Sequence, residues 1–295
     1  LQWNYEKNGV LINVMMKKSG IIISIDFELD WGYRDQDNPL SVDEISKGLD
    51  SLIALLNKHQ IKSTWAIVGQ LFTNNRKEDN SKRQLQWITR NLKENDLIEI
   101  ASHTYNHIFC EELSKELIEE DFTLMKNIAK DNTRDFKSIV FPRNQYSTAN
   151  LYLIKKNSYT HYRSVLEKWY LKTNKYSKEN KIKRNLIKIF DMLPFNRDAI
   201  VGSQNELVSI SDSRFFRFFP PSFLGKIISK IYLIVLMYEL RQCIKRGNLY
   251  HIWFHPHNII KKPNGLKELD LFLKYFKKLK VEKPQIRSYK FTEIG

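Results

Sequence analysis

The chain has 295 residues, of which 42% are hydrophobic, so it can form a large α/β domain whose core needs no disulfide support. Its two cysteines, Cys110 and Cys243, lie far apart and exclude a disulfide framework, which favours a reducing compartment such as the cytoplasm. The net charge of +15 would suit an anionic partner, but the lysines are spread along the chain and no nucleic-acid-binding module accompanies them, so nucleic acid is not expected.

The first strand pattern begins at Ile21, so we expect residues 1–19 to be an N-terminal extension and residues 20–295 to form a single domain. The apolar run from Ile21 is cut by Asp26, which makes it shorter than the roughly 7–15 residues of a signal-peptide core, so secretion is not expected. The strand ends in carboxylates at Asp26 and Glu28. Their i, i+2 spacing places both side chains on one side of a strand.

Helices and strands then alternate along the chain. The pattern predicts a helix at 42–59, a strand at 63–69, a helix at 81–95, a strand at 97–101, a helix at 113–130, a strand at 136–141, a helix at 147–157 and a strand at 160–164. Such alternation is typical of a parallel α/β sheet, whose active sites lie at the carboxyl ends of the strands. Asp26, Gly69, His103 and Arg143 all fall at such ends.

The second half of the chain begins with an irregular segment, residues 165–222, which we expect to be an insertion or a lid over the pocket. Residues 223–246 follow as one long helix, whose segment 231–238 is apolar all round but far shorter than the about 20 residues that span a bilayer. A core-buried helix is the favoured interpretation. The alternative is an interfacial helix that contacts a membrane. The basic residues near this segment are Lys226, Lys230, Arg241 and Lys245. A strand at 249–254, a helix at 264–280 and a strand near 285–291 end the chain.

Two histidines four positions apart, His103 and His107, follow the strand at 97–101. On a helical turn they would point the same way and bind one metal ion, with a carboxylate of the first strand as a third ligand. Two imidazoles, one carboxylate and an open position make up a hydrolytic zinc site. A second carboxylate would take a proton from water, an arginine would hold that carboxylate ionised, and a further histidine would protonate the departing amine. His251, His255 and His257 lie on or directly after the late strand.

Four short motifs in this order are similar to those of the polysaccharide deacetylases, the carbohydrate esterases of family 4. They are Asp26-Phe27-Glu28, His103-Thr104-Tyr105-Asn106-His107, Phe141-Pro142-Arg143-Asn144 and Trp253-Phe254-His255-Pro256-His257-Asn258. The resemblance implies a distorted, incomplete (β/α) barrel and the removal of N-acyl groups from amino sugars with Zn²⁺ or a similar cation, such as Co²⁺, Ni²⁺ or Fe²⁺.

The resemblance also assigns roles to individual residues. It makes Glu28, His103 and His107 the metal ligands, Asp26 the catalytic base, Arg143 the residue that tethers this base, and His255 the acid. The expected substrate-binding residues are Trp31, Tyr105, Tyr146, His257 and Asn258.

The chain also departs from the family pattern. Phe27 occupies the place of the family's second aspartate, so the roles of Asp26 and Glu28 could be exchanged. The third motif runs Pro-Arg in place of Arg-x-Pro, and no Asp-Trp motif orients the acid, so His257 could replace His255.

The expected function is a metal-dependent hydrolase that removes an acetyl or formyl group from an amino sugar during surface polysaccharide or glycolipid biosynthesis. The substrate would be an N-acylated amino sugar or glycan, free or lipid-linked, and the protein would be cytoplasmic with a peripheral membrane contact through residues 223–246. Two alternatives remain open: a related hydrolase of a small cyclic amide, and a catalytically inactive carbohydrate-binding protein with the same fold.

Overall fold

The structure, a computed structural model, describes residues 4–7, 10–13, 18–29, 42–73, 87–88, 90–131, 135–165, 192–204, 206–217, 219, 222–260 and 264–295. Near the N-terminus, strands β1 (Asn4–Lys7) and β2 (Val10–Asn13) pair antiparallel in a two-stranded sheet of their own. This hairpin lies within the predicted extension.

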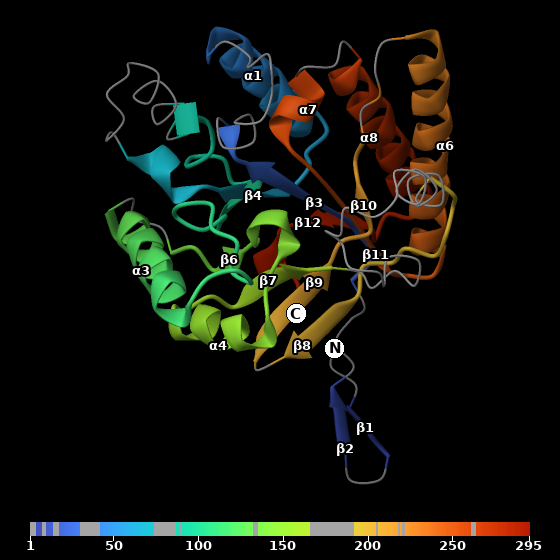
Figure 1. Cartoon of the computed structure of the whole chain (residues 1–295). Helices are drawn as coiled ribbons and strands as arrows, with labels where there is room; N and C mark the ends of the chain where they lie inside the picture. Colours follow the sequence, from blue (N-terminus) through green and yellow to red (C-terminus); the bar gives the residue numbers. More distant parts are fainter. Residues whose placement is uncertain are drawn as a thin grey trace, which may run out of the picture.

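A ten-stranded sheet forms the centre of the molecule (Figure 1), in the order β10-β11-β3-β4-β5-β6-β7-β9-β8, with β12 also paired to β3. Its strands are β3 (Gly20–Phe27), β4 (Ser63–Ile67), β5 (Ile98–Ser102), β6 (Ser138–Ile139), β7 (His161–Ser164), β8 (Val201–Gln204), β9 (Leu207–Ser211), β10 (Arg214–Phe215), β11 (Leu249–Phe254) and β12 (Arg287–Tyr289). Each neighbouring pair is parallel, except that β8 runs antiparallel to β9.

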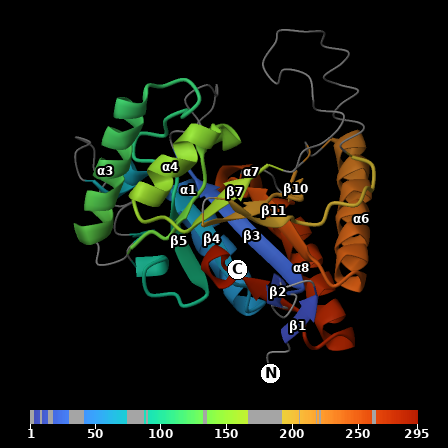
Figure 2. The same cartoon turned by 90° about the horizontal axis from the view of Figure 1, so that it is seen from below.

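The two faces of β3 are buried in different places. On β3, Ile21, Ile23 and Ile25 pack into the large core between the sheet and the helices, whereas Ile22 belongs to a second cluster. This second cluster joins residues from strands far apart in the sheet order, which requires the sheet to curl; its members include Ile22, Ala66, Ala101, Ile210, Leu249, Phe291 and Ile294. Seen from below, the C-terminus lies in the middle of the curled sheet (Figure 2). Because successive side chains of a strand point to opposite faces of the sheet, every second side chain points into the barrel interior.

Helices surround the sheet on its outer side (Figure 1). They are α1 (Val42–Lys58), α3 (Lys115–Asp131), α4 (Thr148–Lys156), α6 (Phe223–Lys245), α7 (Pro256–Ile260) and α8 (Gly265–Glu282), with 3-10 helices η2 (Gly69–Phe72), η3 (Pro142–Asn144) and η5 (Phe291–Glu293). The start of α4 is defined by a capping box, in which Ser147 and Asn150 each accept a hydrogen bond from the other's backbone N–H. The predicted α/β fold, a distorted and incomplete (β/α) barrel, is confirmed.

Two expectations need correction. The segment 165–222 was expected to be an insertion or a lid, but its described part contributes β8, β9 and β10 to the main sheet. The apolar segment of α6 was expected to be buried in the core, but Ile231 and Ile234 are 52% and 65% exposed. The predicted helix at 81–95 lies largely outside the described residues.

Among the described residues, none of the helices combines the length and the apolar character that crossing a bilayer requires.

Candidate active site

Strand β3 delivers two acids to the carboxyl end of the barrel. Ser24, Asp26 and Glu28 are two residues apart, so they share the inward face, and Phe27 points to the opposite core. Asp26 is 2% and Glu28 7% exposed. Burying two carboxylates is costly unless cations or hydrogen-bond donors face them. The neighbouring strands supply both.

His103 and His107 lie on a loop that is held by hydrogen bonds to Asp121, not on a helical turn. Both carboxylate oxygens of Asp121 accept backbone hydrogen bonds of 2.7 Å, one from Tyr105 and one from Asn106. Thr104 and His107 adopt left-handed φ angles of 62° and 55°. The loop thus brings His107 back beside His103, with ring centroids 5.1 Å apart. The expected convergence of the two imidazoles holds, but the expected helical geometry does not.

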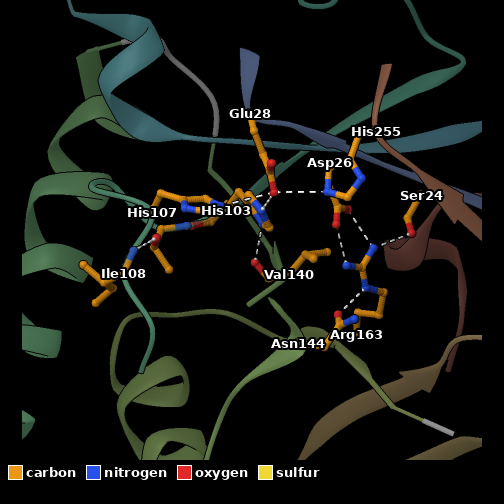
Figure 3. Close-up of polar contacts among 12 residues, drawn as sticks. Ser24, Asp26, Glu28, His103, His107, Ile108, Val140, Asn144, Arg163 and His255 are labelled. Atoms are coloured by element: carbon orange, nitrogen blue, oxygen red, sulfur yellow. Dashed lines mark hydrogen bonds and ion pairs between the residues drawn. The ribbon is translucent and has the colours of Figure 1, made fainter. Parts of the chain in front are cut away.

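Three imidazole rings contact the Glu28 carboxylate (Figure 3). Its Oε1 lies 3.1 Å from Nε2 of His103, 3.2 Å from Nε2 of His107 and 3.3 Å from Nε2 of His255. Burial acts to raise the pKa of Glu28, but His255 and the hydrogen bonds from His103 and His107 hold it well below its usual value. The pKa of His107 is lowered, mainly by burial. An ionised Glu28 carboxylate facing a neutral His107 ring follows from these shifts.

This donor set fits a divalent metal ion. The ligand atoms of Glu28, His103 and His107 all lie within 4.8 Å of one another. The Nδ1–H of His103 donates to the Val140 carbonyl oxygen at 2.8 Å, so in the neutral ring the Nε2 lone pair faces the Glu28 carboxylate. Two electron-rich atoms at this distance repel each other unless a proton or a metal ion lies between them, and neighbouring ligands of a tetrahedral zinc ion lie about 3.3–3.6 Å apart.

Asp26 is held by Arg163, on the inward face of β7 (Figure 3). Its two carboxylate oxygens accept hydrogen bonds of 2.7 Å from Nη1 and Nη2 of Arg163, and both side chains are almost completely buried. Nε of Arg163 donates to Asn144 Oδ1 at 2.8 Å, and the guanidinium lies 4.4 Å from the Trp253 ring centroid. Burial acts to raise the pKa of Asp26, but Arg163, with smaller contributions from His103 and His255, outweighs burial and the pKa is lowered.

The expected tether, Arg143, lies elsewhere. It is exposed in η3 with a left-handed φ of 54°, and its guanidinium packs over the Phe109 ring at 3.9 Å. The guanidinium bound to Asp26 is therefore that of Arg163, and the prediction of Arg143 in this place was wrong. The signal that could have identified Arg163 is its position in the predicted strand at 160–164, two residues after the inward-facing His161.

A buried chain of hydrogen bonds continues behind Arg163. Its Nη1 donates to Ser24 Oγ at 3.1 Å, and Ser24 donates to Nε2 of His251 at 2.8 Å. The Nδ1–H of His251 donates to the Ser211 carbonyl oxygen at 3.0 Å. Burial and the Arg163 charge lower the pKa of His251 to about 4, so the ring is neutral and can accept from Ser24.

His255 lies directly after β11, on the face shared by His251 and Trp253. Burial acts to lower its pKa, but Glu28 and Asp26 raise the net pKa above the usual value. Asn258 Nδ2 donates to Nδ1 of His255 at 3.4 Å, which leaves the Nε2–H directed at Glu28. The His257 ring stacks on that of His255 at 5.1 Å. Of the two histidines considered for the role of acid, His255 has its Nε2 beside Glu28.

The aromatic residues expected to bind sugar take part in packing. Tyr146 stacks on Phe141 with ring centroids 5.0 Å apart, and burial raises the pKa of Tyr146 to about 12. Tyr105 packs against the core, and a Cβ added at Gly69 would lie 2.6 Å from its ring. Trp31 lies outside the described residues.

The polysaccharide deacetylase family model matches residues 35–162. This segment contains His103 and His107 but neither the acids of β3 nor Arg163 and His255. The comparison with curated proteins found no match.

Solved structures with the same fold cover almost the whole chain. A structure from Mycobacterium smegmatis that was assigned to the polysaccharide deacetylases has a TM-score of 0.62 and 11% identity, over 95% of this chain and 90% of that one. A structure from Pseudomonas aeruginosa PAO1, assigned in the same way, has a TM-score of 0.60 and 11% identity, over 92% and 89% of the two chains. Puue allantoinase has a TM-score of 0.57 and 11% identity, over 95% and 90%. At this identity the likeness concerns the fold. The resemblance to the polysaccharide deacetylase family is therefore confirmed, in sequence over residues 35–162 and in fold over nearly the whole chain.

Proposed function

We propose that the protein is a metal-dependent hydrolase that removes an acetyl or formyl group from an amino sugar in surface polysaccharide or glycolipid biosynthesis. The observation that carries this proposal is the buried Glu28 carboxylate, which directly follows β3. It lies within 3.3 Å of three imidazole nitrogens and two residues after the arginine-bound Asp26. Hydrolysis of an amide requires a polarised carbonyl, a base for the water and an acid for the amine. Each requirement has a candidate residue in this cluster.

Glu28, His103 and His107 would hold a divalent ion, which would supply Lewis-acid polarisation of the amide carbonyl. Asp26 is suited to take the proton of the attacking water, because Arg163 offsets the effect of burial and keeps this carboxylate ionised at neutral pH. Arg163 orients this carboxylate through two hydrogen bonds. His255, which the carboxylates keep more basic than usual, is suited to give a proton to the departing amine.

The lipid-linked form of the substrate and a cytoplasmic location are also part of this proposal. Both cysteines are free and buried, as suits a reducing compartment. A glycan carried on a lipid requires the enzyme to approach a membrane surface.

The test is acetate release from N-acetylated amino-sugar oligomers by the purified protein. We expect release to stop on chelation and to return with Zn²⁺, and we expect His103→Ala to remain inactive under the same conditions. If acetate is not released and a small cyclic amide is hydrolysed with the same metal dependence, the amino-sugar assignment fails. If the protein neither hydrolyses these substrates nor binds metal, the chain is an inactive member of the fold.

A further inference from the structure

Helix α6 exposes an apolar stripe on its solvent side. The exposed fractions are 83% for Phe223, 65% for Leu224, 40% for Ile227, 52% for Ile231, 65% for Ile234 and 53% for Tyr238. Spacings of three and four residues place these side chains on one face of the 23-residue helix. We call this set the α6 stripe.

The opposite face of α6 already packs on the rest of the protein. Tyr232, Leu236 and Leu240 are buried, and the helix contacts α8 and β11. In both views α6 forms one outer side of the molecule (Figures 1 and 2). The α6 stripe is therefore a second apolar face, which packing among the described residues does not use. Contiguous apolar surface of this kind marks a contact with another molecule or a membrane.

The charges on α6 indicate what that contact is. Lys226 and Lys230 are exposed along one edge of the α6 stripe, and Arg241 and Lys245 continue its line at the C-terminal end. Glu239 is the single acidic residue of α6; it is 2% exposed and binds Arg214 and Tyr250. The outer face of α6 thus combines apolar side chains with positive charges alone, which suits an anionic lipid surface.

A second copy of the chain is a poorer occupant of the same face. In a twofold interface through α6, each copy would bring Lys226, Lys230, Arg241 and Lys245 to the other copy's identical face. Because this face of α6 offers no acidic partner, the like charges would repel one another.

The orientation of α6 connects this face to the active site. Residues 246–248 reverse the chain between α6 and β11, so the first turn of α6 lies at the same end of the molecule as His255. The Tyr232 hydroxyl donates to the Phe215 carbonyl oxygen at 2.6 Å, and the Phe215 ring lies 5.9 Å from that of His255. Phe223, the most exposed residue of the α6 stripe, and its neighbour Leu224 thus belong to the active-site end.

We propose that the outer face of α6 docks on an anionic membrane leaflet, with the apolar side chains in the headgroup region and the lysines and Arg241 on lipid phosphates. The docked protein holds its catalytic end beside the bilayer surface, where a lipid-borne glycan can reach Asp26 and His255. This last point rests on the proposed function, whereas the docking does not.

The test is flotation of the full chain with vesicles of phosphatidylcholine containing phosphatidylglycerol, and with vesicles of phosphatidylcholine alone. We expect binding to the anionic vesicles that weakens at high salt, and much weaker binding to the neutral ones. The double variants Ile231→Gln/Ile234→Gln and Lys226→Glu/Lys230→Glu are each expected to lower the vesicle affinity by at least about tenfold. Leu117→Gln/Tyr152→Gln, which changes side chains that are 50% and 59% exposed on α3 and α4, is the matched control and is expected to float like wild type.

The proposal is overturned if the wild-type protein stays unbound, or if both α6 variants float like the control. It is also overturned if light scattering shows a dimer that Ile231→Gln/Ile234→Gln dissociates, because the α6 stripe would then bind a second copy. His103→Ala is expected to keep vesicle binding, and the α6 variants are expected to keep hydrolysis of a water-soluble substrate. Docking and catalysis can therefore fail separately.

Discussion

Arg163 on β7 and Asp26 on β3 form a doubly hydrogen-bonded ion pair inside the barrel, although three strands separate β7 from β3 in the sheet order. The pair is possible because the sheet curls, so that the inward faces of distant strands converge. Its two hydrogen bonds leave Asp26 with a fixed orientation and a lowered pKa.

Replacement of Arg163 by Met is expected to lower kcat/KM by about 10²-fold or more, because the base loses its orientation and its ionised state. It is also expected to lower the free energy of unfolding by about 3–5 kcal/mol, since Asp26 stays buried without its cation. Acetate release and thermal unfolding measure the two effects. Arg143→Met is the matched control, with both quantities near wild type. Equal losses in the two variants would contradict the role given to Arg163.

Variants of His255 and His257 are expected to distinguish an effect on proton transfer from an effect on metal binding. His255→Ala should keep the metal ion but lower kcat by about 10²–10⁴-fold, because the amine leaves without its acid. His257→Ala should have a much smaller effect, since its ring stacks on His255 rather than extending to Glu28. Elemental analysis together with turnover rates checks this. A larger loss in His257→Ala than in His255→Ala would exchange their roles.

Asp121→Ala is expected to weaken metal binding by about 10–100-fold, the usual effect of losing a residue that supports metal ligands. The backbone N–H groups of Tyr105 and Asn106 lose their acceptor, so the loop carrying His103 and His107 loses its brace. Competition with a chromogenic chelator measures the affinity. Glu120→Ala, an exposed neighbour on α3, should leave it unchanged. Wild-type affinity in Asp121→Ala would mean that the loop keeps its shape without this carboxylate.

The two thiols are expected to resist alkylation in the folded protein. Burial raises the pKa of Cys110 to about 12 and also raises that of Cys243, so neither forms thiolate near pH 8. Between about pH 9 and 12 the unfolded state binds fewer protons at Cys110 than the folded state, so the free energy of unfolding falls as the pH rises. Mass spectrometry after iodoacetamide treatment should find both thiols unmodified in the native protein and modified in urea. Rapid labelling of native protein would contradict this burial.

Local sequence patterns were sufficient to predict which residues are candidate metal ligands. Asp26 and Glu28 share a strand face by period-two alternation, and the strand that precedes His103 ends at the same edge of the sheet. Parallel pairing then brings these residues together without knowledge of the detailed packing. The parallel α/β sheet and most helix boundaries followed from the alternation of elements, whereas the barrel followed from the resemblance to the polysaccharide deacetylases.

The features that could not be predicted from the sequence depend on long-range packing. Which arginine meets Asp26 depends on the curl of the sheet, and the proline and the left-handed backbone of η3 turn Arg143 away. The strands β8 and β10 are short and irregular in sequence, so their place in the sheet is set by pairing with β9 and β11. A helix that is apolar all round is normally buried. At the edge of this fold, the described part of the chain covers one face of α6 and leaves the α6 stripe exposed.

The most direct test of the central claim is an anomalous difference map at the zinc edge from crystals of the zinc-loaded protein. The account predicts a peak bound by Glu28 Oε1, His103 Nε2 and His107 Nε2 at about 2.0–2.2 Å, with Asp26 still paired to Arg163. A peak bound through Asp26 in place of Glu28, or no peak beside His103 and His107, would contradict it.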